Sequence, residues 1–282
     1  QPVVIVKIDD TDQAHPQVGI DKAKIVFIEQ VEGGLVRLAA VFNSSLPEFI
    51  GPVRSARISD IDLAAQFGKV AFFYSGAQTK FLPVLRSANL IDLGAEHESS
   101  KLYRRDSKRT APYDLLLYGP EAERTIAPLD VAASTDLAIK FAESSEIGSS
   151  IQSVKVNWPA ANYRAVWSGT SWDLFHNGKV DITSDGVRIS PSTFVIQKVV
   201  ITPSIYHDRE GGITPFSATV GVGTGWILRD GMAIAANWSR PTSQSQTIWT
   251  DAKGNEIPFS KGQVWVALTD QQPEFTSAPP KK

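Results

Sequence analysis

The chain has 282 residues, of which 42% are hydrophobic and 21% charged, a composition typical of soluble globular proteins with room for a substantial core. Its formal net charge of −2 argues against a dedicated nucleic-acid-binding protein, because such proteins are usually clearly basic. The absence of cysteine excludes a disulfide scaffold, a zinc finger, an iron–sulfur site and a thiol nucleophile in this sequence.

The start of the chain bears on its location. No stretch approaches the roughly 18 consecutive apolar residues of a membrane-spanning helix. The sequence begins with Gln1 rather than Met, which is typical of a processed or trimmed N-terminus. A signal peptide or a lipid-bearing residue would then lie upstream of it.

The first half of the chain mixes strand and helix patterns. Runs of β-branched and other apolar residues predict strands over residues 2–8, 23–32, 35–42 and 69–76. A two-residue turn at Gly33-Gly34 is predicted to join the second and third of these strands in a hairpin. Caps, prolines and spacing predict helices over residues 59–68, 77–89, 118–126 and 135–146. The first should be capped by Ser59, and Pro83 should kink the second or delay its start.

From about residue 148 the pattern changes to short strand-like runs separated by tight turns. The turns contain the pairs Asn177-Gly178, Asp185-Gly186, Asp230-Gly231 and Gly254-Asn255. Asn-Gly and Asp-Gly pairs between such runs favour β-hairpins. All seven tryptophans lie at or beyond position 158, which indicates an aromatic-rich core or surface in this half.

These patterns predict two domains and a tail. Residues 1–147 should form an α+β, or mixed α/β, domain in which a mixed sheet is flanked by helices. Residues 148–272 should form a smaller, mainly antiparallel β domain, with the serine-rich residues 143–150 at the boundary. The polar, proline-containing residues 273–282 should form a mobile tail.

The segment GPVRSAR, residues 51–57, is a candidate anion-binding element. Arg54 and Arg57 flank Ser55 just before the predicted helix. Guanidinium groups bind carboxylate and phosphate with a matching fork geometry, and a helix N-terminus adds free N–H donors. The alternative is that both arginines pair with Asp60 and Asp62 and face water.

The segment VEGGLVR, residues 31–37, offers a carboxylate beside a cation. In the predicted two-residue hairpin, Glu32 and Arg37 lie on one face of the sheet and diagonal to each other. Such a pair is common as a purely structural contact. It is also a way to keep an acid/base carboxylate ionised.

Three aspartates follow the first predicted strand. Asp9, Asp10 and Asp12 have the oxygen ligands that a hard cation prefers, but aspartates at a strand end more often cap turns. The calcium-loop pattern fails because His15 stands where a glycine is required. The four histidines show no metal-ligand spacing, so we expect neither a metal nor another cofactor.

The basic segment KLYRRDSKR, residues 101–109, contains Arg104 and Arg105. It is either a solvated loop or a lid that carries positive charge over an anion pocket. Several catalytic patterns are absent: residues 73–77 do not form a nucleophile elbow, and Trp226 replaces the third glycine of a dinucleotide fingerprint in residues 221–226.

The motifs together resemble the YerB-like lipoproteins, a bacterial family built on a domain of unknown function. The similarity rests on VKIDD, HPQVGIDKAKIVFIEQVEGGLVRLAAVF, IGPVRSAR and YRRDSKRTAPYDLLL in the first half. In the second half it rests on VGVGTGWILRDGMAIAANWSR and TIWTDAKGNEIPFSKGQVWVAL. This chain carries Tyr113-Asp114 where the family usually has His-Asn, so no imidazole role transfers to that place.

The resemblance implies an exported protein that is tethered to the outer face of the membrane by a lipid on an upstream cysteine. It implies an N-terminal α/β domain joined to a β domain, and it supplies no activity. The family's motif positions correspond to Asp9, Gln17, Glu32, Gly33, Gly34, Arg37, Arg54, Ser55, Arg57 and Arg104 or Arg105.

The leading hypothesis is a binding or regulatory lipoprotein outside the cytoplasm. Its Arg/Glu cleft, formed by Glu32 and the arginines, would bind an anionic cell-wall or lipid-linked ligand, or a partner protein of the envelope. No nucleic acid is expected as a partner, and the membrane only through the upstream lipid anchor.

Two other functions stay open, so the sequence does not decide whether the chain is an enzyme. A hydrolase of a phosphodiester, pyrophosphate or glycosidic bond would use Glu32 as general acid or base. Asp9 would then hold a metal or act as a second carboxylate, while arginines stabilise developing charge. An interaction module would use exposed tryptophans of the β domain.

Overall fold

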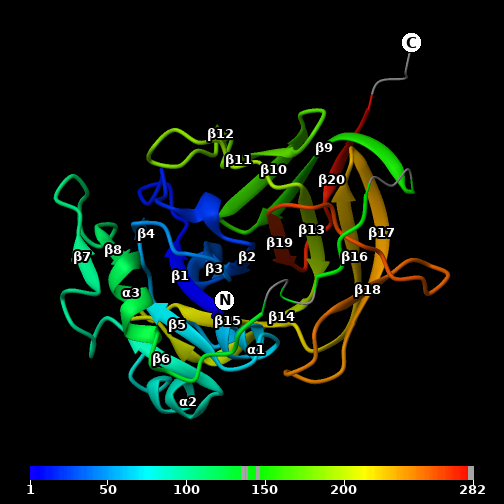
Figure 1. Ribbon diagram of the computed structural model, residues 1–282. Coiled ribbons are helices and arrows are strands. Elements are labelled where there is room, and N and C mark those ends of the chain that lie inside the picture. Colours follow the sequence, from blue (N-terminus) through cyan, green and yellow to red (C-terminus); the bar gives the residue numbers. More distant parts are fainter. Residues whose placement is uncertain (135–136, 138, 144–146, 279–282) are drawn as a thin grey trace.

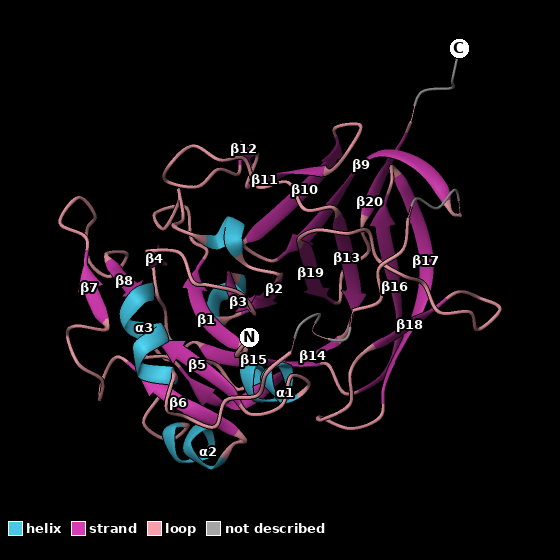
Figure 2. Cartoon of the chain, viewed as in Figure 1, coloured by secondary structure: helices cyan, strands magenta, loops and turns pink. Residues whose placement is uncertain are grey.

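The computed structural model describes residues 1–134, 137, 139–143 and 147–278, and strands dominate this part of the chain (Figures 1 and 2). Its main feature is one sheet of 15 strands. In spatial order the sheet runs β12 (Lys179–Val180), β11 (Trp172–His176), β10 (Ala161–Trp167), β9 (Ser149–Trp158), β17 (Met232–Arg240), β16 (Gly221–Arg229), β13 (Thr193–Lys198), β19 (Val264–Thr269), β2 (Ile25–Gln30), β3 (Val36–Phe42), β1 (Val4–Asp9), β5 (Val70–Tyr74) and β6 (Leu90–Gly94). Two more strands attach to it, β18 (Ile248–Thr250) on β17 and β20 (Glu274–Ser277) on β9.

The expected N-terminal domain with helices flanking a sheet is wrong, because the structure is mostly β. The described residues form three short α-helices, which are α1 (Ser59–Ala65), α2 (Leu82–Ser87) and α3 (Gly119–Ile126). Two single turns of 3₁₀-helix are η1 (Ile20–Lys22) and η2 (Glu32–Gly34). Helices this short cannot cover a sheet face, and their stability depends on the packing around them.

The individual elements follow the sequence more closely than the architecture does. The four predicted N-terminal strands appear as β1, β2, β3 and β5. The helix predicted over residues 77–89 begins only at Leu82, which agrees with the delayed start expected from Pro83. The predicted helix 135–146 falls partly outside the described residues. In its described part, Phe141 instead forms a β-bridge with Phe259. Within the expected tail, residues 274–277 form β20 on β9.

One sheet runs through both halves of the chain. β19, near the C-terminus, pairs in parallel with β2, so that Val264 lies opposite Ile25 and Ala267 opposite Ile28. β19 also pairs in parallel with β13. The second half is therefore not purely antiparallel, and its strands continue the sheet of the first half.

Both faces of the sheet are buried at β1. Val4, Val6 and Ile8 of β1 belong to one apolar cluster, and Val3 and Ile5 belong to the other. This alternation is what a strand produces when both of its faces are covered. The tryptophans belong to these cores or are partly buried, and none of the seven is exposed. An interaction surface of exposed tryptophans is therefore ruled out.

Two small sheets complete the fold. β14 (Val200–His207) and β15 (Ile213–Ala218) form a two-stranded hairpin, called the arm below. The arm extends from the second half of the chain, and its strand β15 lies beside α1, β2 and η2 (Figure 1). The other small sheet contains β4 (Phe49–Ile50), β8 (Leu115–Tyr118) and β7 (Tyr103–Arg105) and lies beside α3 (Figure 2).

Candidate functional site

A cleft of about 1460 Å³ lies where the arm meets the first half of the chain. Its walls come from four segments, which are residues 53–58, 75–82, 95–105 and 206–214. Six predicted ligand-binding residues line it, together with Glu32: Arg37, Arg54, Ser55, Arg57, Arg104 and Arg105. Asp9 does not line the cleft.

The segment GPVRSAR is extended and held on both sides. The Arg54 N–H donates to the Lys7 carbonyl of β1, and the Ser75 N–H after β5 donates to the Arg54 carbonyl. At its start, a Cβ on Gly51 would lie 2.9 Å from the Leu115 carbonyl oxygen, so only glycine fits there. The sequence thus turns tightly at Gly51 and runs along the wall of the cleft.

The helix that follows offers no free N-terminus to an anion. The Asp60 and Ile61 N–H groups donate to the Arg57 and Ile58 carbonyls, and Asp60 Oδ2 accepts the Arg57 N–H at 2.6 Å. No side chain caps α1, so Ser59 is not the cap that the sequence predicted. The Ser59 hydroxyl instead accepts the Ser217 N–H of the arm at 2.9 Å. The start of α1 therefore adds no anion-binding N–H group to the cleft.

Arg54 is held by a buried carboxylate. Its Nε donates to Asp9 Oδ2 at 2.7 Å, while Asp9 Oδ1 accepts the Thr11 N–H at 2.9 Å. Asp9 is 1% exposed. It therefore acts as a counter-charge beneath Arg54 rather than as a group that a ligand can reach.

Glu32 pairs with Arg57 and not with Arg37. Arg57 Nε and Nη2 donate to the Glu32 carboxylate at 2.7–2.9 Å, and the Thr214 hydroxyl of the arm donates to Glu32 Oε1. Burial raises the pKa of Glu32, but the bonds and charge of Arg57 together with Thr214 outweigh burial and hold it below 4.5. The carboxylate is thus kept ionised.

The predicted two-residue hairpin fails at its turn. Gly33 and Gly34 form η2 with φ values of 67° and 73°, which glycine adopts readily, and the Val31 N–H bonds to the Leu35 carbonyl. This longer turn shifts the register by one residue, so that Arg37 lies opposite Glu29. A shift of one residue changes which side chains face each other.

Arg37 is a buried cation of the cleft that has few partners. It is 9% exposed, and its Nη1 donates to the Ser55 carbonyl at 3.0 Å. Among the described residues it belongs to no ion pair with a carboxylate. Burial, and then the neighbouring charge of Arg57, lower the pKa of Arg37 to about 9.

Arg104 and Arg105 lie on the opposite wall, on β7. The Arg104 guanidinium stacks 3.4 Å from the centre of the Tyr118 ring. Arg105 Nη1 pairs with Asp114 at 2.7 Å and is mostly exposed. Both basic residues therefore belong to a folded strand at the edge of the cleft, which supports neither a free lid nor an unstructured loop.

Sequence reasoning missed the contribution of the arm. Thr214 bonds Glu32, His207 Nδ1 lies 3.0 Å from Gln78 Nε2, and Tyr206 packs edge-on against Phe81. The available signal was the run YHDREGGIT, in which polar and glycine residues separate two strand-like runs. That pattern predicts a hairpin but not what its tip contacts.

A buried charge cluster beneath the cleft was also missed. Lys7, which is 0% exposed, bonds Asp60 Oδ1 at 2.8 Å and contacts Glu29. The signal was a lysine inside the otherwise apolar run VVIVKI, since lysine is almost never fully buried without a partner. The cluster fixes β1, β2 and α1 under the arginines.

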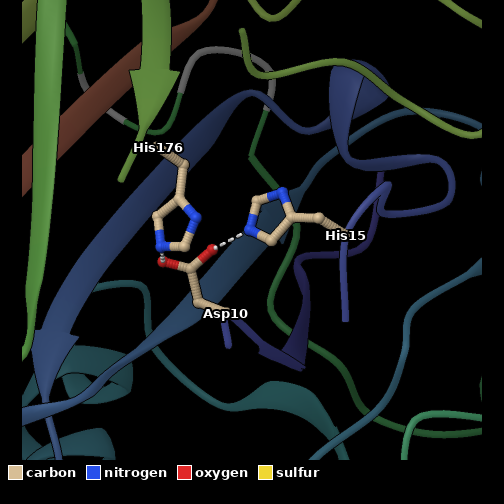
Figure 3. A group of neighbouring side chains, drawn as sticks. All are labelled: Asp10, His15 and His176. Carbon is tan, nitrogen blue, oxygen red and sulfur yellow. Dashed lines mark hydrogen bonds and ion pairs between the residues drawn. The ribbon is translucent and has the colours of Figure 1, made fainter. Parts of the chain in front are cut away.

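A second polar cluster lies on the other face of the sheet, where the fold brings together Asp10, His15 and His176 (Figure 3). The two histidines are far apart in the sequence, so no spacing rule could join them. Asp12 accepts a hydrogen bond from Asn177 Nδ2 at 2.8 Å. Of the three aspartates, therefore, one faces the cleft side and two face this cluster.

Comparisons with known proteins agree with the resemblance noted from the motifs. Residues 1–132 match the family described as "Protein of unknown function (DUF3048) N-terminal domain", and residues 153–266 match its C-terminal domain. The chain is 23% identical to "Putative lipoprotein YerB" of Bacillus subtilis (strain 168), over 95% of this chain and 81% of that protein.

The crystal structure of the YerB protein from Bacillus subtilis has the same fold, with a TM-score of 0.82 at 19% identity over 97% of this chain and 94% of that one. In the described part of the chain, no helix is long and apolar enough to cross a membrane. With both of its domains matched in order along the sequence, this chain is a member of the DUF3048 family of YerB-like lipoproteins.

Proposed function

We propose that the cleft binds an anionic ligand of the bacterial cell envelope. The observation that carries the proposal is the convergence of Arg37, Arg54 and Arg57 at one end of the cleft, called the arginine end below. Two of these arginines have carboxylate partners, whereas the buried Arg37 has one backbone bond and no carboxylate. A bound anion would supply the missing counter-charge.

The chemistry of the arginine end favours a phosphate or carboxylate group. A guanidinium presents N–H donors in a planar fork that matches two oxygens at once. Arg37 uses Nη1 for Ser55, which leaves its other nitrogens available on the cleft side. Such bonds are strong where the surroundings exclude water, and Arg37 is nearly buried.

The size of the cleft favours a ligand larger than a single anion. Its volume of about 1460 Å³ exceeds the roughly 300–1,000 Å³ of ordinary small-molecule pockets. Acidic side chains also line it, namely Glu96, Glu98, Asp208 and Glu210. The ligand should therefore extend beyond its anionic group, as a cell-wall or lipid-linked molecule can.

The hydrolase alternative receives less support from the geometry. Both oxygens of Glu32 are occupied by Arg57 and one also by Thr214, so the carboxylate has no free site for a substrate proton. Its lowered pKa makes it a poor general acid near neutral pH. Asp9 is bonded to Arg54 and lies outside the cleft.

The envelope location rests on the relative's name and on the family, and we propose that this chain too is held outside the cytoplasm by an upstream lipid. Fractionation of cells that produce the full-length natural protein tests this. Recovery in the membrane fraction, with loss of anchoring when an upstream cysteine is replaced, is the expected result. Recovery in the cytoplasm would contradict it.

Titration calorimetry with inorganic pyrophosphate tests the anion site. Arg37→Gln should weaken binding by at least about tenfold, the value of one charged hydrogen bond. This variant removes a cation that has no carboxylate partner, so it leaves no buried acid unpaired. Arg164→Gln is the matched control, because Arg164 stacks on Phe175 away from the cleft. Equal binding by wild type and Arg37→Gln would contradict the proposal.

A second measurement identifies the source of the anion. Sedimentation with vesicles of an anionic phospholipid and, separately, with isolated cell-wall sacculi compares lipid and wall ligands. If Arg37→Gln reduces co-sedimentation of the protein with the vesicles or with the sacculi, the cleft is supported as the binding site. If neither sediments the wild-type protein more than the variant, the envelope ligand is rejected even where pyrophosphate binds.

A further inference from the structure

We propose that Asp10, His15 and His176 form a binding site for a divalent transition metal ion such as Zn²⁺. The three residues, called the Asp10 cluster below, come from the loop after β1 and from the end of β11 (Figure 3). A bound ion would fasten these two segments together. The inference does not depend on the anion site in the cleft, which lies on the other face of the sheet.

The ligand atoms already lie close to one another. His15 Nε2 is 3.0 Å from Asp10 Oδ1, and His176 Nε2 is 3.8 Å from Asp10 Oδ2. The three ligand atoms all fall within 4.8 Å of each other. Zinc bonds of about 2.0–2.2 Å set tetrahedral ligand atoms about 3.3–3.5 Å apart. The two imidazole rings are stacked, with their centres 4.3 Å apart and an angle of 9° between their planes, so one ring must turn for both Nε2 atoms to point at one ion.

The other nitrogen of each imidazole faces a carboxylate. His15 Nδ1 is 3.4 Å from Asp181 Oδ1, and His176 Nδ1 is 3.6 Å from Asp12 Oδ1. Histidines that bind metals almost always donate their second ring N–H to such a partner, which fixes the tautomer and leaves the first nitrogen free. Both histidines of the cluster therefore present Nε2 to the same carboxylate.

A buried polar atom in the cluster lacks a hydrogen-bond partner in the described part of the chain. His176 is 4% exposed, yet its Nε2 makes no hydrogen bond among the described residues. Asp181 is 1% exposed, and its Oδ1 faces only His15 Nδ1, at 3.4 Å. Unsatisfied buried atoms are costly and rare in folded proteins. A metal ion bound to His176 Nε2 would satisfy that atom directly.

Asp10 is positioned for this role by neutral donors. The Tyr163 hydroxyl lies 2.9 Å from Asp10 Oδ1 and 3.0 Å from Oδ2, and Gln17 Nε2 donates to Oδ1 at 2.9 Å. Such bonds orient a ligating carboxylate without adding charge. His15 is the most accessible member, with 16% of its side chain exposed, and marks the side from which an ion and a water ligand can enter.

The ligand set selects the class of metal. Two imidazoles and one carboxylate suit zinc and similar ions, whereas Mg²⁺ and Ca²⁺ prefer oxygen ligands throughout. Asp10 and His15 belong to the N-terminal family domain, and His176 belongs to the C-terminal one. The ion would therefore add a link between the two domains beside the β-bridge that joins Gln17 to Thr183.

Zinc titration of the chelator-treated wild-type protein tests the proposal. We expect one Zn²⁺ per chain by elemental analysis, a rise in the melting temperature with Zn²⁺, and no comparable rise with Mg²⁺. His176→Gln should abolish both zinc effects. His97→Gln, which changes a histidine of the loop after β6, is the matched control and should retain both.

X-ray absorption of the zinc-loaded wild-type protein provides a measurement that does not depend on a variant's folding. Imidazole ligands in its spectrum support the site, and a zinc environment without imidazole overturns it. No zinc bound by the wild type at micromolar concentrations overturns it as well. In that case the cluster is an ion-pair network, with a charged His15 between Asp10 and Asp181.

Discussion

Asp9 and Asp10 are neighbours in the sequence but belong to two polar regions of opposite character. Asp9 points to the cleft face, where it meets Arg54 and lies opposite Arg37. Asp10 points to the other face, where it meets His15 and Tyr163. Alternation along a strand separates the two carboxylates, although their backbone positions are adjacent.

The difference teaches what each region can bind. At the arginine end, three arginines have two carboxylate partners in ion pairs, Asp9 and Glu32, and the cleft is open, which favours an anion. At the Asp10 cluster, the carboxylate of Asp10 and those of the neighbouring Asp12 and Asp181 lie around two mostly buried imidazoles, which favours a cation. One strand end thus supplies the counter-charge for two sites of opposite sign.

The largest expected effect is a loss of folding stability, and it tests whether the buried charges around Lys7 stabilise the cleft side of the sheet. Lys7→Met removes the cation that contacts Glu29 and Asp60, and breaking a buried ion pair costs about 3–5 kcal/mol. Denaturant unfolding measures this loss. Lys22→Met removes a surface cation paired with Asp21 and should change stability by less than about 1 kcal/mol. Similar losses of unfolding free energy in both variants would show that the buried charge cluster does not stabilise the structure beneath the cleft.

The next prediction compares the two aspartates directly. Asp10→Asn should weaken zinc binding by at least about tenfold, because a neutral amide is a poor zinc ligand. Asp9→Asn should leave zinc binding unchanged and should not weaken pyrophosphate binding, because it releases Arg54. Calorimetric titration of both variants with both probes measures the pattern. If the two substitutions had the same effect on zinc binding, the separation of the two regions would be wrong.

The sequence predicted which residues gather at the cleft better than it predicted the fold. Arg54 and Arg57 were recognisable as candidates because guanidinium groups bind carboxylate and phosphate, and both line the cleft with Glu32. Their partners were not predictable, because a single extra turn residue at Gly33-Gly34 moved Glu32 from Arg37 to Arg57.

The architecture depended on contacts that local patterns do not encode. The pairing of β19 with β2 joins residues at opposite ends of the chain, and the hydrophobic periodicity of neither strand predicts its partner. The same holds for His15 and His176, whose meeting is set by the position of β11. Short helical patterns such as residues 59–68 were real but too small to define a layer.

The smallest expected effect is a change in stability at low pH, and it compares the buried carboxylate of Glu32 with an ordinary surface carboxylate. The folded-state pKa of Glu32 lies below 4.5, its usual value, because of Arg57 and Thr214. A lowered pKa gives stability that is fully present above pH 4.5 and is lost as the pH falls through the folded-state value. Glu32→Gln should therefore cost about 1.5 kcal/mol near neutral pH and much less at about pH 3.

Urea unfolding of wild type and Glu32→Gln at both pH values measures this narrowing gap. Glu48→Gln is a suitable control, because Glu48 forms no ion pair among the described residues and should show a small and constant difference. A gap between wild type and Glu32→Gln that stays constant from neutral pH to acid would mean that Arg57 does not hold the carboxylate ionised. Glu32 would then be free to carry a proton, and the argument against an acid role in the cleft would lose its basis.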